Sequence, residues 1–168
     1  MIIQRRNAVL LLALALVISA CSMEDIVTTR AERYVRQNYN DVHRIISVTI
    51  DTVTIGDNLD VSIRQALDRL SYASEKYVES GSELYYDEVQ KYHAYINALD
   101  SLKTVLGDVS NEVAAYNCIV AYNYPHNLVW VQLDEYGNLR NITKDPGRLL
   151  VNPGRTVPGL YELSERYR

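Results

Sequence analysis

The chain has 168 residues, of which 48% are hydrophobic and 23% charged, and its formal net charge is −4. This composition is typical of a globular protein and excludes a collagen-like, low-complexity or wholly disordered chain. The length allows one domain and hardly two, and the acidic balance without a basic run argues against a dedicated nucleic-acid binder.

The N-terminal segment, residues 1–20, has the pattern of a secretory leader. Arg5 and Arg6 form a positive start, and residues 8–18 follow without a charge. That apolar run is shorter than the roughly 20 residues that a membrane-spanning helix needs, and it has the length of a signal-peptide core. We therefore expect residues 1–20 to be a cleaved signal peptide that is not part of the fold.

The end of this leader, Ile18-Ser19-Ala20-Cys21, resembles the lipobox of bacterial lipoproteins, in which an aliphatic residue and two small residues precede a cysteine. In that family a signal peptidase recognises the residues that Ile18, Ser19 and Ala20 match. The resemblance implies that Cys21 receives a diacylglyceryl group, that cleavage occurs before it, and that the new amine is acylated. Two or more acyl chains hold a protein stably at a membrane without crossing it. The alternative is an ordinary cleaved signal peptide with an incidental cysteine.

The residues after Cys21 bear on which membrane holds the protein. Ser22 stands where enterobacterial lipoproteins retained in the inner membrane have an aspartate, so the resemblance favours the outer membrane. Glu24 and Asp25 are similar to the acidic surface-export signal of Bacteroidota lipoproteins, but such a pair is equally typical of the first turn of a helix. Both a periplasmic and a surface-facing domain therefore stay open.

Cysteine use fits an anchored protein. If lipid occupies Cys21, Cys118 has no partner within the chain, so the sequence predicts neither a disulfide framework nor a cysteine-based metal site. Cys118 lies in an apolar run, and we expect a buried small hydrophobic side chain rather than a reactive thiol.

After the leader, apolar periodicity predicts a helix and then a strand. Residues 24–39 carry apolar side chains at helical spacing. Residues 44–55 alternate with a period of two, and the change of apolar parity near Asp51 and Thr52 predicts a bulge or a bend. The next residues, Gly56-Asp57-Asn58, predict a turn that also supplies capping side chains.

From residue 60 to residue 106 the pattern is helical again. Ser80-Gly81-Ser82 interrupts it, and glycine inside a helix costs about 1 kcal/mol relative to alanine. We therefore expect either two helices or one helix kinked at Gly81, with Gly107 as a C-terminal cap. Strands are then predicted, with short turns between them, over residues 113–124, 128–133 and 139–143.

The last segment, residues 145–168, is punctuated by three Pro-Gly pairs and predicts an irregular tail, either draped over the domain or mobile. The order of helix, strand, long helical region and antiparallel meander predicts an α+β fold in a single domain over residues 21–144. This order is similar to the cystatin-like and nuclear-transport-factor-like folds, in which a curved antiparallel sheet wraps a helix. It also resembles small Bacteroidota lipoproteins of unassigned function, although the helical stretch is longer than a cystatin needs.

Motifs that carry chemistry are missing from the chain. His43, His93 and His126 lie in no metal-binding pattern, and Asp51 and Asp100, which share a face with His43 and His93, are too far along a strand or a helix for direct hydrogen bonds. Nucleophile elbows, phosphate loops, dinucleotide fingerprints and calcium loops do not occur either. We expect no catalytic residue, no metal and no cofactor.

Tyrosine is the one compositional oddity, with 14 residues against one tryptophan and no phenylalanine. Tyrosine combines a large contact area with a polar tip, which suits contact with protein, peptide or glycan surfaces. The alternative is that tyrosine replaces phenylalanine as core filler, as expected of Tyr85 and Tyr92 on the apolar stripe. Tyr86 and Tyr95 fall off that stripe and are the candidates for exposed contacts.

These observations favour a non-enzymatic binding or structural module that contacts the membrane of the bacterial envelope through lipid and does not bind nucleic acid. Two alternatives rest on fold resemblance alone. One is a small enzyme of the nuclear-transport-factor-like type with a polar cup inside its sheet. The other is a cystatin-like protease inhibitor, although the inhibitory signature Q-x-V-x-G does not occur in the chain.

Overall fold

The computed structural model describes residues 22–123 and 127–168, and it has the predicted α+β architecture. A helix and a strand are followed by a long helical region and then by the remaining strands of an antiparallel sheet. In chain order the elements are α2 (Met23–Asn38), β1 (Ile45–Thr54), α3 (Ile55–Ser80), α4 (Glu83–Leu106), η1 (Gly107–Asn111), β2 (Val113–Tyr122), β3 (Asn127–Asp134), β4 (Leu139–Thr143), η2 (Pro146–Arg148) and α5 (Leu160–Arg166).

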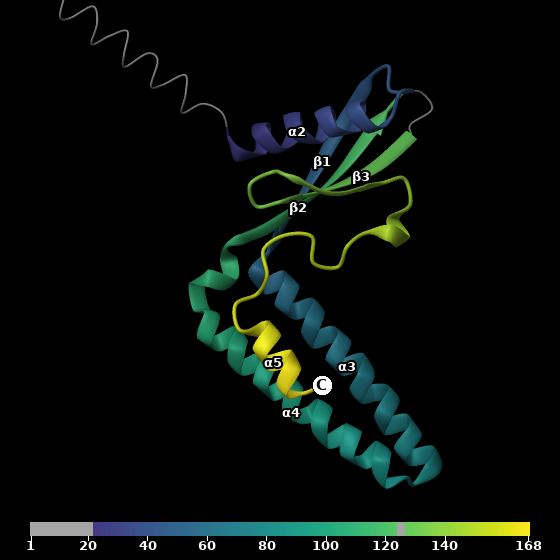
Figure 1. Ribbon diagram of the computed structural model, residues 1–168, viewed down its shortest axis with the longest axis vertical. Helices are drawn as coiled ribbons and strands as arrows, with labels where there is room; N and C mark the ends of the chain where they lie inside the picture. Colours follow the sequence, from purple (N-terminus) through teal and green to yellow (C-terminus); the bar gives the residue numbers. More distant parts are fainter. Residues whose placement is uncertain (1–21, 124–126) are drawn as a thin grey trace, which may run out of the picture.

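The molecule consists of a sheet with a helical hairpin projecting from one end (Figure 1). The sheet has the order β1-β2-β3-β4, with every neighbouring pair antiparallel. The hairpin, α3 and α4, is inserted between β1 and β2, whereas α2 lies across the sheet at the other end of the molecule. At 1.5 Å per residue, the 26 residues of α3 extend about 39 Å.

The first core lies between α2 and one face of the sheet. Ser22 caps α2: its side chain accepts a hydrogen bond from the Asp25 backbone nitrogen at 3.2 Å, and the Asp25 carboxylate accepts one from the Ser22 nitrogen at 3.1 Å. This reciprocal pair is a capping box, which satisfies otherwise free backbone donors at the start of the helix. Helical spacing brings three fully buried residues of α2 onto the sheet, namely Val27, Ala31 and Val35.

The even-numbered residues of β2 face this core, because side chains alternate between the two faces of a strand. Tyr116 and Tyr122 are buried there together with Cys118 and Val120. Part of the tyrosine excess therefore fills the core in the place of phenylalanine.

The bulge or bend predicted near Asp51 and Thr52 lies just beyond them. Both residues pair with β2 in continuous register, and the register shifts directly afterwards, between Val53 and Thr54, with a second shift at the start of β1. The apolar parity changes because Val53 turns to the opposite face of the sheet, while Ile55 already belongs to α3.

The turn predicted at residues 56–58 is wrong, because these residues form the first turn of α3. The predicted capping side chain is present: the Asp57 carboxylate accepts a hydrogen bond from the Thr54 nitrogen at 2.7 Å, and Thr54 Oγ1 accepts one from the Asp57 nitrogen at 3.1 Å. A capping box in this position starts the helix directly after the strand.

The long helical region is two helices, as one of the two alternatives predicted. Gly81 ends α3 in the left-handed conformation, with φ of 63°, which glycine adopts without steric cost. Gly107 follows α4 as its C-terminal cap. At the base of the hairpin, α3, α4 and the start of β2 enclose a second core that includes Ile55, Leu59 and Leu99.

The C-terminal strap, defined as residues 145–168, lies over the second face of the sheet and ends as α5 along the hairpin (Figure 1). Gln132, which is 2% exposed, holds the strap by both atoms of its amide. Its Oε1 accepts a hydrogen bond from the Leu150 nitrogen at 2.7 Å, and its Nε2 donates one to the Leu150 carbonyl at 3.0 Å. Neighbouring amides of Asn117 and Asn141 complete its hydrogen bonds, so a buried polar group is fully satisfied.

Farther along, the strap is pressed against the start of β2. The Arg155 nitrogen donates a hydrogen bond to the Ala114 carbonyl at 2.9 Å. A Cβ atom on Gly154 would lie 1.7 Å from that same carbonyl oxygen, a distance that no atom pair tolerates. Glycine is therefore required at this position by close approach of the backbone.

We expect Gly154→Ala to destabilise the protein by about 2 kcal/mol or more, because the strap must move away from β2. Chemical unfolding followed by circular dichroism measures this loss. Gly147→Ala is the matched control in the same strap, since the nearest atom to its Cβ, at 3.2 Å, belongs to the flexible Asp145 side chain. Equal unfolding free energies for the two variants would contradict the close packing of the strap on the sheet.

Candidate functional site

The residues predicted to direct lipidation, Ile18, Ser19, Ala20 and Cys21, lie outside the described residues. The structure begins at Ser22, directly after Cys21, and Glu24 and Asp25 form the acidic first turn of α2. The residues that directly follow the proposed anchor, Cys21, therefore form the start of α2.

The two tyrosines predicted to make surface contacts lie in different surroundings. Tyr86 is 45% exposed near the end of the hairpin. Tyr95 is half-buried against the second core, and its ring centroid lies 5.2 Å from that of Tyr167 beside α5. Tyr95 is less exposed than expected because the strap folds back onto α4. Its burial also raises the pKa of the Tyr95 hydroxyl.

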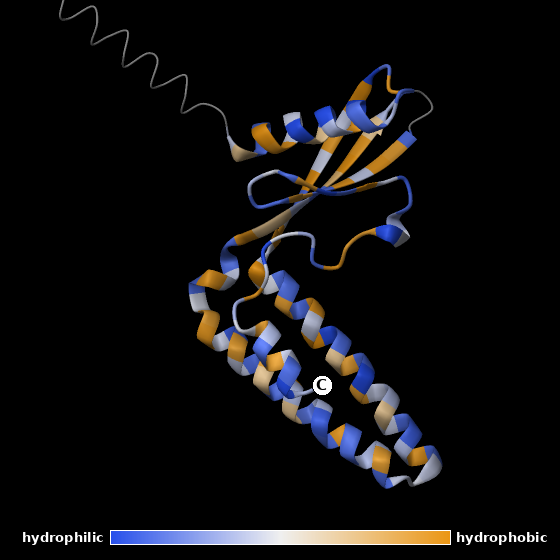
Figure 2. Ribbon diagram, in the orientation of Figure 1, coloured by the Kyte–Doolittle hydropathy of each residue, from blue (hydrophilic) through white to orange (hydrophobic). Residues whose placement is uncertain are grey.

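The hairpin tip, defined as residues 75–88, has exposed apolar side chains on both helices. Val78 is 84% exposed and Leu84 is 66% exposed. In the same tip, the ring centroids of Tyr77 and Tyr86 lie 5.5 Å apart. Apolar positions thus continue to the far end of the hairpin (Figure 2), although no part of the described chain covers them.

Thin packing explains this exposure. In the outer half of the hairpin, which lies within the described residues, the one buried residue is the small Ala73, whereas the second core at the base buries Ile55, Leu59, Ala66 and Leu99. Two helices alone cannot enclose a core, because each leaves part of its apolar surface facing water. The hairpin tip therefore presents apolar surface that the fold itself does not use.

The hairpin also holds the whole net charge of the chain that follows the leader. Residues 55–112 contain 11 acidic and 5 basic residues, whereas acidic and basic residues are equal in number over the rest of residues 22–168. Within the tip, five carboxylates accompany one cation, Lys76, which pairs with Glu79 at 2.7 Å. None of the other four carboxylates forms a salt bridge within the described part of the chain; they are those of Glu75, Glu83, Asp87 and Glu88.

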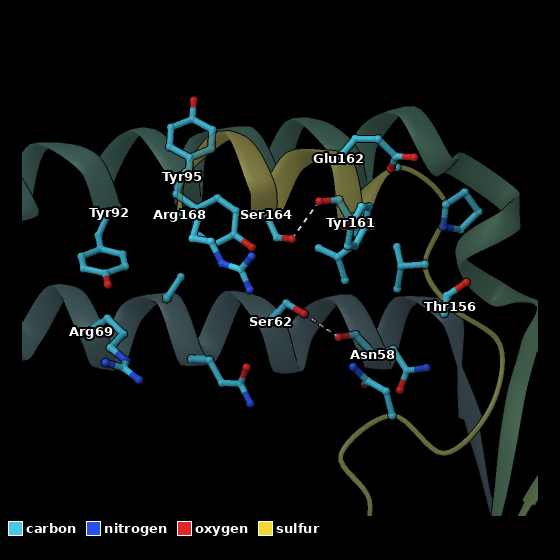
Figure 3. A pocket seen from close by; sticks show the side chains of 18 of the residues that line it. Asn58, Ser62, Arg69, Tyr92, Tyr95, Thr156, Tyr161, Glu162, Ser164 and Arg168 are labelled. Carbon is cyan, nitrogen blue, oxygen red and sulfur yellow. Dashed lines mark hydrogen bonds between the residues drawn. The ribbon is translucent and has the colours of Figure 1, made fainter. Parts of the chain in front are cut away.

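An open cleft of about 1300 Å³ lies between α3 and the strap, on the side of the hairpin that carries α5. Figure 3 shows side chains of Ser62 and Arg69 from α3 facing those of Ser164 and Arg168 across it, with Tyr92 of α4 at one end. The lining is a mixture of hydroxyls, amides, aromatic rings, apolar side chains, cations and the carboxylates of Asp68 and Glu162, without a histidine or a cysteine.

The cleft can form hydrogen bonds but holds no nucleophile with an adjacent base. Asn58, at the end of the cleft near Thr156, donates its Nδ2 hydrogen to the Arg155 carbonyl at 3.4 Å and so ties α3 to the strap (Figure 3). Its Oδ1 is buried and accepts no hydrogen bond from the described protein atoms. A buried oxygen without a hydrogen-bond donor costs about 1–3 kcal/mol.

Buried titratable groups serve the fold. Burial by itself would raise the pKa of Asp134, but hydrogen bonds from Asn138 and Tyr136, with a contribution from the nearby Arg140, lower it. Asp134 thereby holds the turn between β3 and β4 in its ionised form. Burial raises the pKa of the Cys118 thiol to about 12, so this cysteine is protonated near neutral pH.

We expect Cys118 to resist alkylation in the folded protein, because the thiolate fraction at pH 8 is only about one part in 10⁴ and the side chain lies in the core. Mass spectrometry of the Cys118 peptide after timed exposure to iodoacetamide measures the rate. The same protein in guanidinium chloride is the control and should react about 100-fold faster or more. Equal rates in the two conditions would show that the thiol is accessible.

Residues 22–123 and 127–168 contain no cluster of three or more metal-ligating side chains. His43 and His93 lie on the surface, and His126 lies outside the described residues. In the described part of the chain, no helix is both long enough and apolar enough to cross a membrane.

Comparison with protein-family models, with curated proteins and with solved structures found no match to this chain. Function must therefore be argued from the chain itself. The sequence located the hairpin tip through the Ser80-Gly81-Ser82 break, but it did not single out Val78 and Leu84. The cleft had no sequence signal, because its walls come from segments more than 80 residues apart.

Proposed function

We propose that this protein is a lipid-anchored module of the bacterial envelope that acts by binding or structural contact rather than by catalysis. The anchor is Cys21, acylated after removal of residues 1–20, and the outer membrane is the membrane that holds it. The support for the anchor is the lipobox-like sequence at Ile18-Ser19-Ala20-Cys21 together with the length of the apolar segment before it.

The observation that carries the proposal is the separation of the two ends of the molecule. Helix α2 begins at Met23, two residues after Cys21, and packs at the sheet end, while the hairpin projects from the opposite end (Figure 1). An anchor at Cys21 leaves α3 and α4 free to extend from the domain by about 39 Å. A long projection with uncovered apolar residues suits contact with another molecule.

The enzyme alternative required a polar cup inside the sheet. The sheet face under α2 is instead filled with Val, Tyr and Leu side chains, among them Val120, Tyr122 and Leu133. The opposite face carries buried amides that are occupied with holding the strap. A cystatin-like inhibitor remains a separate prediction, and an assay against papain-type proteases tests it.

We expect Cys21→Ser to abolish incorporation of labelled palmitate and to leave a precursor that keeps residues 1–20. Serine retains the size of cysteine but lacks the sulfur that forms the thioether. Radiolabelling of cells and electrophoretic mobility measure the two effects. Cys118→Ala is the matched control at the other cysteine and should be labelled and processed as the unchanged protein. A Cys21→Ser protein of mature mobility that stays in the membrane would contradict the anchor.

The orientation of the domain is decided by protease treatment of intact cells, with lysed cells as the control. Digestion on intact cells indicates a surface-facing domain, whereas protection until lysis indicates a periplasmic one. The hairpin offers the cleavage sites for this assay, since α3 has the exposed residues Arg64 and Arg69 in a helical pair with few buried side chains.

A further inference from the structure

We propose that the hairpin tip, residues 75–88, binds a protein surface that combines Lys or Arg side chains with apolar ones. This inference rests on the proposed function, because it names the partner chemistry of the projecting hairpin. Its components are the uncovered apolar residues at the tip, the carboxylates on the same helix ends and the orientation of the tip away from α2.

The apolar part of the surface supplies the affinity. Val78 and Leu84 lie on the two sides of the turn at Gly81, and the same tip holds the paired rings of Tyr77 and Tyr86. Tyrosine rings bring large contact areas with few rotatable bonds, and their faces attract the guanidinium of arginine or the ammonium of lysine.

The charged part of the surface selects the partner. Glu75, Glu83, Asp87 and Glu88 have no salt-bridge partner among the described residues, and they lie on the same two helix ends as the exposed apolar side chains. A surface that combines exposed apolar side chains with unneutralised carboxylates is complementary to a surface that combines apolar side chains with Lys or Arg. The charged contacts speed association and suppress wrong partners, while the apolar contacts hold the complex together.

The same charges disfavour the other occupants of an apolar tip. Anionic phospholipid headgroups repel carboxylates, so insertion of the tip into a bacterial membrane is opposed. A second copy of this chain docking tip to tip brings ten carboxylates together against two lysines, which costs energy at every contact of like charge. A basic protein surface is the occupant that gains from both parts of the tip.

Photo-cross-linking in living cells tests the proposal with the full-length chain. A diazirine amino acid is introduced at position 84 in the tip, and the protein that it captures is identified by mass spectrometry down to the cross-linked segment. Position 105 at the hairpin base is the matched control, because Val105 is 82% exposed but lies outside the tip. We expect a protein adduct from position 84 whose cross-linked segment is rich in Lys or Arg, and none from position 105.

Charge reversal separates a specific contact from random capture. Glu83→Lys combined with Asp87→Lys should lower the yield of the adduct about tenfold. Asp100→Lys, a reversal of an exposed carboxylate on the same helix but away from the tip, should leave the yield unchanged. Raising the salt concentration in isolated membranes before irradiation should also lower the yield, since salt screens exposed charges.

The proposal is overturned by an adduct with phospholipid, an adduct with a second copy of the chain, an adduct with an acidic or neutral segment, or equal yields from positions 84 and 105. Palmitate labelling of the same cells keeps the two proposals distinct. If the chain is labelled with palmitate but gives no tip adduct, only the proposal about the partner is refuted. A tip adduct from an unlabelled chain refutes the lipid anchor alone.

Discussion

Antiparallel pairing of β1 with β2 is the constraint on which the rest of the structure depends. These strands are neighbours in the sheet although 58 residues separate Thr54 from Val113. In an antiparallel pair, the first strand ends and the second begins at the same end of the sheet. Any segment inserted between the two strands must therefore leave and return at that end. Two helices of similar length joined at Gly81 satisfy this requirement, and a hydrogen bond from the Ile55 nitrogen to the Glu112 carbonyl at 3.0 Å closes their base.

This arrangement divides the molecule into a well-packed half and a thinly packed half. The sheet is covered by α2 on one face and by the strap on the other, and both cores lie at or near it. The outer hairpin buries only the small Ala73 and presents apolar side chains to water. Such exposure lowers solubility without adding to stability, and it is the observation behind the proposed contact with a partner.

The strap connects the two halves. Gln132 holds it on the sheet, Gly154 allows it to approach β2, and α5 continues along α4. Its position hides Tyr95 and forms the wall of the cleft opposite α3. The segment thus determines which hairpin residues near the base are available at the surface, while the tip extends beyond its reach (Figure 1).

The sequence by itself determined the elements whose signal is local. The spacing of apolar residues and the positions of glycines predicted α2, the break at Gly81 and the strands after residue 113. Both signals depend only on residues that are close together in the sequence. The same local rules predicted an irregularity near Asp51 and Thr52, and the register shift lies between Val53 and Thr54, where the strand passes into α3.

Only the tertiary structure decided which side chains are free. Tyr86 and Tyr95 carry the same sequence signal, yet one is exposed and the other is half-buried, because the strap returns from 65 residues away to cover the second. The exposure of Val78 and Leu84 likewise follows from where the sheet, α2 and the strap end. Burial depends on contacts between distant segments, and a local pattern of residues does not specify those contacts.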